Sequence, residues 1–196
     1  MIVKQPNPLK ISVTGHRSIF KSETQLVNSI CRVLKRISRT YEKSEISLYS
    51  ALAEGSDQLV AESALENKNF RLQVPLPMAI EDYLETFNSE KAIKNFKELL
   101  SRAGSIEILP ATENPQAAFE ALGVYLVKQA DILLAVWNGE FNHKKGGTSE
   151  VVKLALSSEK LVYWIFCPNE VLDAKNSLLG KRKIGELTEL NHISNL

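Results

Sequence analysis

Apolar and polar positions divide the chain into two kinds of segment, short apolar runs and longer amphipathic stretches. The run from Ile132 to Val136 is apolar throughout, which is typical of a strand buried on both faces of a parallel sheet. The clearest amphipathic stretch follows Ser22 and places apolar residues three or four positions apart, the spacing of one helix face. Its apolar residues are Leu26, Val27, Ile30, Val33, Leu34 and Ile37.

Turn and capping residues set the expected bounds of the elements. We expect strands at Lys10 to Thr14, Ile46 to Ser50, Arg71 to Val74, Ile106 to Leu109, Ile132 to Val136 and Leu161 to Cys167. The third strand is expected to be stopped by Pro75 and Pro77. Helices are expected at the N-cap residues Ser22, Ser56, Ser89, Asn114 and Thr148, with a short helix over Glu81 to Phe87.

Strand and helix alternate along the chain, which predicts an α/β fold with an open parallel sheet and helices on both faces, three layers in all. The 196 residues suit a single domain over residues 1–196. Its core is expected over about residues 10–167, and the segment 168–196 is a more polar C-terminal extension.

The composition narrows the classes of partner. The formal net charge is +1, so no general basic field favours nucleic acid, and the basic run Lys181 to Lys183 is expected to be a solvated surface. No apolar run approaches the roughly 20 residues that span a bilayer, so we expect a cytoplasmic protein without a membrane partner. Cys31 and Cys167 are expected to be separate thiols. The residues indicate no metal site and no cofactor, and they are compatible with a homo-oligomer.

Three glycine-bearing loops follow expected strands. They are Gly15-His16-Arg17, Glu54-Gly55-Ser56-Asp57 and Gly146-Gly147-Thr148. If the strands are parallel, all three loops lie at one sheet edge, where ligands bind in open α/β folds. The polar excursion from Trp137 to Lys145 is also longer than the usual loop of about 2–6 residues. The loops therefore predict a cleft suited to a nucleotide.

The last of these loops is suited to an anion. Two glycines let an oxygen approach the backbone N–H groups at the start of the helix at Thr148, which have no partner within the helix. The chain has neither a Walker-type glycine-lysine loop nor a G-x-G-x-x-G fingerprint, which disfavours triphosphate hydrolysis and hydride transfer.

The residues of these loops resemble those of the SLOG superfamily, which unites DNA-processing protein A with the Lonely Guy phosphoribohydrolases. The resemblance rests on Val13 to Arg17, Ser50 to Asp57 and Gly146 to Glu150, and it covers roughly Lys10 to Cys167. It implies a Rossmann-like domain that binds nucleotides or their derivatives at the same cleft. The chain differs from the Lonely Guy motif because no proline precedes Gly146 and Val151 replaces the second glutamate.

Glu150 is the candidate catalytic residue. It could bind ribose hydroxyls or act as an acid or base on an N-glycosidic bond, and alternatively it only stabilises the start of its helix. Arg17 could clamp a phosphate or be a surface arginine. The other candidate ligand contacts are Gly15, His16, Glu54, Gly55, Ser56, Asp57, Trp137, Gly146, Gly147 and Thr148.

Each of the remaining polar candidates also has a structural alternative. Asp57 could hold a ribose or strengthen a helix start, and His16 could contact a ligand or hydrogen-bond the backbone. Trp137 could stack on a base or close the sheet edge.

Three hypotheses of function follow. The first is a protein that binds a nucleotide or a nucleotide-derived small molecule, as a sensor would. The second is a hydrolase or transferase that acts on the N-glycosidic bond of nucleoside monophosphates. The third is a DNA-processing scaffold, which the near-neutral charge disfavours.

Overall fold

The structure is a computed structural model that describes residues 8–19, 23–42, 44–141, 145–168 and 182–192. Its strands are β1 Leu9–Gly15, β2 Ile46–Tyr49, β3 Phe70–Leu76, β4 Ser105–Ile108, β5 Ile132–Trp137, β6 Leu161–Phe166 and β7 Leu187–Leu190. Its helices are α1 Glu23–Thr40, α2 Ser56–Leu65, α3 Ile80–Leu84, α4 Glu90–Ser101, α5 Pro115–Gln129 and α6 Thr148–Ser157. The alternation predicted from the sequence is confirmed.

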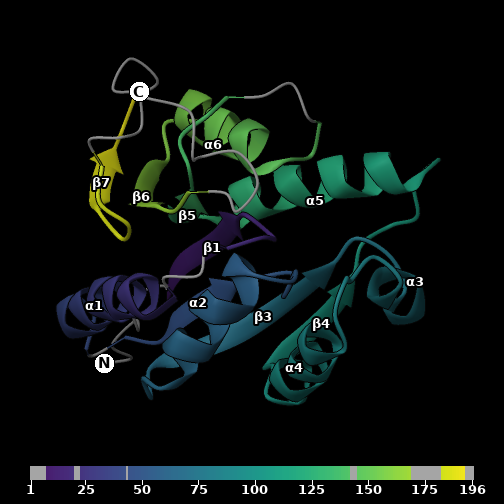
Figure 1. The fold of residues 1–196 in the computed structure, drawn as a ribbon, viewed down its shortest axis with the longest axis horizontal. Helices are drawn as coiled ribbons and strands as arrows, with labels where there is room; N and C mark the ends of the chain where they lie inside the picture. Colours follow the sequence, from purple (N-terminus) through teal and green to yellow (C-terminus); the bar gives the residue numbers. More distant parts are fainter. Residues whose placement is uncertain (1–7, 20–22, 43, 142–144, 169–181, 193–196) are drawn as a thin grey trace, which may run out of the picture.

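The strands form one seven-stranded sheet in the order β4-β3-β2-β1-β5-β6-β7 (Figure 1). From β1 the chain builds outward to β4, and after α5 it returns to place β5 beside β1. The pair β1–β5 is therefore the point at which the strand order reverses. In open α/β sheets the crevice outside the carboxyl ends of such a pair is the usual position of a ligand.

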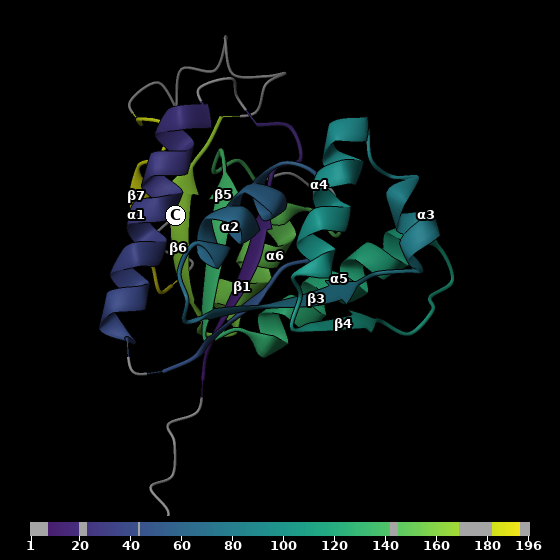
Figure 2. The same ribbon diagram turned by 90° about the horizontal axis from the view of Figure 1, so that it is seen from below.

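Helices cover both faces of the sheet, as expected. Helices α1, α2 and α4 lie on one face, whereas α5 and α6 lie on the other (Figures 1 and 2). Strand β5 separates two apolar clusters, because Leu134 and Val136 pack on the side of α1 and α2 and Leu133 and Ala135 pack on the side of α6. This double burial explains why the strand is apolar throughout.

Strand β3 does not end at Pro75 but continues to Leu76. The Gln73 carbonyl accepts from Ser50 N on the β2 side, and the residues of one strand alternate in the side to which their backbone polar groups point. Pro75 therefore faces the β2 side as well, where pairing with β2 has already stopped at Gln73. No ladder hydrogen bond is lost, so the proline is compatible with the strand.

The C-terminal extension contributes an edge strand that its polar sequence did not predict. Strand β7 pairs antiparallel with β6, from Val162 opposite Leu190 to Ile165 opposite Leu187. Arg182 is bound to this edge, because its guanidinium lies 4.2 Å from the Trp164 ring centroid and donates to Thr188 Oγ1 at 2.7 Å. Arg182 is thus part of the fold rather than a freely solvated charge; Lys183 is exposed, and Lys181 lies outside the described residues.

The helix starts match the capping predictions at Asn114 and Ser89, whose side chains accept from Ala117 N and Ala92 N. At α2 and α6 the N-cap residues are Gly55 and Gly147, one position before the predicted Ser56 and Thr148, and neither start has a side-chain cap. The predicted cap Ser22 lies outside the described residues.

The two cysteines are not joined in a disulfide, as predicted; Cys31 lies in α1 and Cys167 is buried after β6. None of the helices in the described part of the chain is long and apolar enough to cross a membrane. Within the same residues, no group of histidine, cysteine and carboxylate side chains could hold a metal ion.

Candidate functional site

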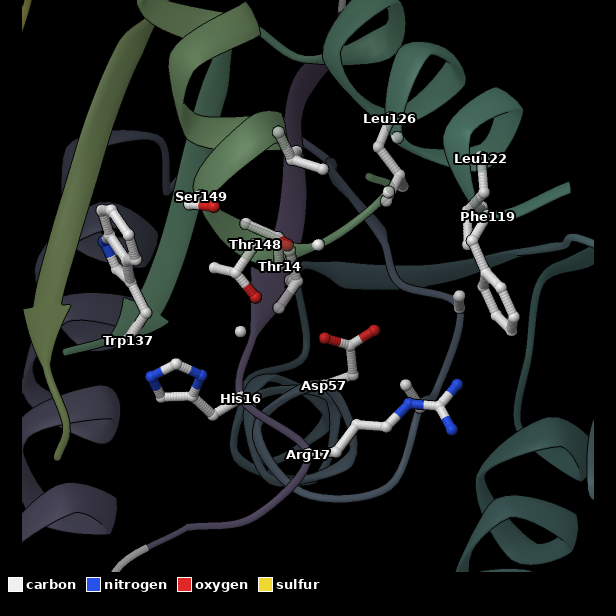
Figure 3. Close-up of a pocket in the computed structure, with 18 of the residues that line it drawn as sticks. Thr14, His16, Arg17, Asp57, Phe119, Leu122, Leu126, Trp137, Thr148 and Ser149 are labelled. Carbon is white, nitrogen blue, oxygen red and sulfur yellow. The ribbon is translucent and has the colours of Figure 1, made fainter. Parts of the chain in front are cut away.

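A cavity of about 550 Å³ opens at the carboxyl ends of β1 and β5. Figure 3 shows Thr148 and Ser149 of α6 on one side of it and His16, Asp57 and Arg17 on the opposite side. Helix α5 lines the cavity with the apolar side chains of Phe119, Leu122 and Leu126 (Figure 3), and near its start with Gln116. The structure thus brings residues of all three glycine loops to one sheet edge, as the sequence predicted.

The first two loops pack tightly against each other. Ser56 N donates to the His16 carbonyl at 3.0 Å, and His16 N donates to the Val136 carbonyl at 3.0 Å. A Cβ on Gly15 would lie 2.5 Å from Ser56 Cβ. Gly55 has φ 91°, and a Cβ there would lie 2.2 Å from the Arg17 carbonyl oxygen. These glycines are therefore needed for close packing between the loops, a requirement that the sequence motif did not reveal.

The third loop brings the N-terminus of α6 to the cavity. Gly146 has φ 67°, which favours glycine, and its position against Phe119 leaves little room for a Cβ. Gly147 has φ −85° and ψ 168°, a backbone conformation that any residue adopts. Thr148, the first residue of α6, lines the cavity beside it. The first turn of this helix therefore faces the cavity with its partial positive charge.

Asp57, in the first turn of α2, lines the cavity although its side chain is only 6% exposed. Burial raises the pKa of its carboxyl from 3.8 to about 7, against the opposing effects of the Arg17 charge and a backbone hydrogen bond from Ala53. At neutral pH the group is therefore present in both protonation states. Perturbed carboxyl groups of this kind are concentrated at functional sites.

Arg17 lies beside Asp57 but is held by other groups. Its Nη1 donates to the Thr86 carbonyl at 2.9 Å and to Thr86 Oγ1 at 3.3 Å, and its guanidinium lies 5.4 Å from the Phe119 ring centroid. These contacts fix the guanidinium at the cavity wall, between α3 and α5. It does not form an ion pair with Asp57 at 4.0 Å or less.

Tyr83 of α3 is a cavity residue that the sequence did not reveal. The side chain is fully buried, and its ring packs edge-on against Phe87 and Phe96 at centroid distances of 5.3 and 5.9 Å. Its hydroxyl has no hydrogen-bond partner among the described residues. Burial and the charge of Asp57 raise its pKa, and the charge of Arg17 opposes this; all three residues line the same cavity. In the sequence Tyr83 is one apolar position of a short helix, which gives no sign of this role.

His16 and Trp137 both line the cavity, with different local roles. His16 Nε2 accepts a hydrogen bond from Asn138 N at 3.0 Å, which is the backbone contact considered as an alternative for this residue. Trp137 is 1% exposed and packs against Trp164 at a centroid distance of 6.0 Å, so it belongs to the core on the α6 side. Glu140 and Lys145 also line the cavity, whereas His143 and Lys144 lie outside the described residues.

Four predicted site residues are absent from this cavity lining, namely Glu54, Gly55, Ser56 and Glu150. The carboxylate of Glu54 accepts from Asn88 N and Ser89 Oγ, both at 2.8 Å, and so it secures the start of α4. Ser56 is buried, and its side chain packs against Gly15. Glu150 is exposed in the first turn of α6. A second cavity of about 530 Å³, between α2 and α4, includes Glu54 and Gly55 in its lining.

No family model and no curated protein matches this chain. Among solved structures, the fold is similar to DNA processing protein A from Streptococcus pneumoniae, with a TM-score of 0.56 and 17% identity over 88% of this chain and 55% of that one. The protein TM1055 matches with a TM-score of 0.47 and 12% identity, over 78% of this chain and 71% of that one. The Moco carrier protein from Chlamydomonas reinhardtii also has a TM-score of 0.47, with 18% identity over 86% of each chain.

The chain spans about half the length of DNA processing protein A, and the similarity between the two concerns the fold. That protein is one of the two that the sequence motifs resemble. The structural comparison thus agrees with the Rossmann-like fold that the motifs implied. This chain has the Rossmann-like α/β fold found in DNA processing protein A.

Proposed function

We propose that the protein binds a nucleotide or a nucleotide-derived small molecule in the cavity at the β1–β5 switch point. The observation that carries this proposal is the combination, in one cavity, of a helix N-terminus with the buried carboxyl of Asp57 and the unpartnered hydroxyl of Tyr83. A volume of about 550 Å³ lies in the usual range of small-molecule sites. Polar groups converge on it from three loops, while α5 supplies an apolar wall.

The phosphate end of the ligand is assigned to the first turn of α6. Backbone N–H groups and the helix dipole attract an anion there, and Lys145 adds a positive charge to the same part of the lining. Gly147 lies at the N-cap with a backbone conformation that tolerates a side chain. Replacing it with alanine therefore adds bulk beside the anion without straining the backbone.

The second candidate function is cleavage of an N-glycosidic bond, and one observation favours it. A carboxyl group with a pKa of about 7 can exchange a proton near neutral pH, which general acid–base catalysis requires. In this candidate, Asp57 is a better placed carboxyl than Glu150, because Glu150 is exposed and outside the cavity lining. A DNA-processing role has less support, since the formal net charge is +1 and the volume of the cavity, about 550 Å³, is in the range of small-molecule sites.

Thermal-shift and calorimetric titrations with nucleoside monophosphates test the proposal, and chromatography of the same samples tests for released base. Gly147→Ala should weaken binding by about 10–100-fold, the effect of losing one charge-assisted hydrogen bond of ~1.5–3 kcal/mol. Ser157→Ala, at the exposed C-terminal end of the same helix, is the matched control and should bind normally. Equal affinity of both variants for every nucleotide would refute the phosphate assignment.

Comparing two carboxyl variants separates binding from catalysis. If the protein only binds, no free base accumulates with wild type. If it is a glycosidase, Asp57→Asn should reduce base release by about 100-fold or more, whereas Glu150→Gln should not. Loss of turnover in Glu150→Gln alone would instead restore the catalytic role that the sequence motif suggested.

A further inference from the structure

Asp57 and Tyr83 are two buried polar residues that line the cavity and have few hydrogen-bond partners within the described part of the protein. An ionised carboxylate has about four acceptor positions, and the hydrogen bond that Asp57 receives from the backbone is the one from Ala53. The Tyr83 hydroxyl, fully buried, has no partner among the described residues. Leaving a buried polar group without partners costs free energy, because the group loses its hydrogen bonds with water and gains none in the protein. A ligand that satisfies both groups at once would recover that free energy on binding.

Arg17 lies beside these groups, where its Nη1 donates to Thr86 and its guanidinium lies over the Phe119 ring, and it forms no ion pair with Asp57. Its charge nevertheless limits what can bind beside it, since a cationic ligand group would be repelled. An anionic group would be repelled by ionised Asp57. It could bind beside this carboxyl only when the carboxyl is protonated. A neutral group with hydroxyl donors meets neither obstacle.

A pair of hydroxyl groups on adjacent carbons fits this requirement. The two hydrogens can be donated to the two oxygens of one carboxylate, and a hydroxyl oxygen can accept from a tyrosine hydroxyl. The position is also suitable, because Asp57 lies across the cavity from Thr148 at the proposed phosphate end, and the apolar α5 wall remains for a base (Figure 3). In a nucleotide, the sugar lies between the phosphate and the base.

We propose that Asp57 and Tyr83 form a specificity-determining subsite for a vicinal diol, so that the ligand carries an intact ribose and its binding releases a proton from Asp57. This inference rests on the proposed function, because it assigns the sugar of the nucleotide-like ligand. The diol donates to the ionised carboxylate and therefore competes with the proton. The proton leaves to the solvent, and no covalent bond of the ligand changes.

The proton release has a defined size and direction. Asp57, with a pKa of about 7, is about half protonated at pH 7, so binding should release about half a proton at that pH and nearly one at pH 6. Affinity should rise about tenfold between pH 6 and pH 8, as the ionised fraction rises. The charged and titratable groups that line the same cavity are His16 and Arg17 before α1, Tyr83 in α3, and Glu140 and Lys145 before α6. The variants below separate Asp57 from these groups.

The experiment is isothermal calorimetry with the full chain at pH 6, 7 and 8, in two buffers of different ionisation enthalpy. The probes are the four ribonucleoside monophosphates and the 2′,3′-dideoxy analogue of the tightest of them. The ligand phosphate titrates equally in both analogues, so the difference between them reports on the diol. We expect the dideoxy analogue to bind at least tenfold more weakly and to release no proton from Asp57.

Two variants assign the effect to residues. Asp57→Asn should abolish the difference in proton release between the two analogues, and Tyr83→Phe should weaken ribonucleotide binding by about tenfold while the dideoxy analogue is unaffected. Asp82→Asn, which changes an exposed aspartate of α3, is the matched control and should behave as wild type.

The results also distinguish failure of this inference from failure of the proposed function. Absence of binding by all four nucleotides would overturn both. Binding with equal affinity for the dideoxy analogue, or with proton uptake instead of release, would leave the proposed function in place and refute the diol subsite.

Discussion

The buried carboxyl of Asp57 makes a prediction about folding that requires no ligand. Its pKa is raised to about 7 by burial, compared with 3.8 for the exposed group, so the folded protein holds this proton to a higher pH than the unfolded chain. The stability contributed by protonated Asp57 is complete below about pH 4 and is lost as the pH rises through about 7. Asparagine has nearly the same size and cannot ionise. Asp57→Asn should therefore become more stable relative to wild type as the pH rises.

The two pKa values give the size of this effect. Within the interval from about 4 to about 7, each pH unit lowers the free energy of unfolding of the wild type by about 1.4 kcal/mol. Between pH 5 and pH 8, the ionisation of Asp57 therefore lowers the free energy of unfolding of the wild type by about 2–3 kcal/mol in total. The Asp57→Asn variant lacks this loss, so its stability relative to wild type should rise by the same amount.

Urea unfolding at pH 5, 6, 7 and 8, followed by the fluorescence of Trp137 and Trp164, measures this change. Other groups titrate over the same range, but their contributions cancel in the difference between variant and wild type. Asp82→Asn is the control and should show a constant difference. A pH-independent difference for Asp57→Asn would refute the claim that this carboxyl is buried and perturbed in the folded state.

Three further predictions concern single residues. Without ligand, Tyr83→Phe should be as stable as wild type or more stable, by up to about 1–3 kcal/mol. The reason is that the change removes an unpartnered buried hydroxyl and keeps the ring. A large decrease in the melting temperature would contradict this. Gly55→Ala should destabilise by about 1–3 kcal/mol or more, owing to φ 91° and the contact with the Arg17 carbonyl, whereas Gly147→Ala should be nearly neutral in urea unfolding. Arg182→Ala should cost about 1 kcal/mol and speed amide exchange in β7, and unchanged exchange there would show that the contact with Trp164 does not hold the strand.

Much of the fold could be predicted from the sequence because local signals and burial agreed. The apolar run at Ile132 marked the strand that both apolar clusters share, and Asn114 with Pro115 marked the start of α5. Strand β7 was missed because its stability comes from tertiary contacts, pairing with β6 and the stacking of Arg182 on Trp164, that leave no local pattern. Pro75 was misjudged because its effect depends on where the neighbouring strand stops.

The candidate site was predictable in position but not in composition. Loops that follow parallel strands must meet at one edge, so the residues at Gly15, Asp57 and Gly147 could be grouped without a structure. The contribution of Tyr83 depends on where α3 packs, and the outward direction of Glu150 depends on the rotation of α6, neither of which follows from a motif. Glu54 lies in the same loop as Asp57, but its carboxylate accepts hydrogen bonds from Asn88 and Ser89 at the start of α4.

The central claim, that the cavity between β1 and β5 is a nucleotide site, is tested most directly by crystals grown with the tightest-binding ribonucleoside monophosphate. We predict that the phosphate lies at Gly147 and Thr148, that the ribose hydroxyls contact Asp57 and Tyr83, and that the base lies against Phe119. A nucleotide bound instead in the second cavity between α2 and α4, or at another surface, would contradict the claim.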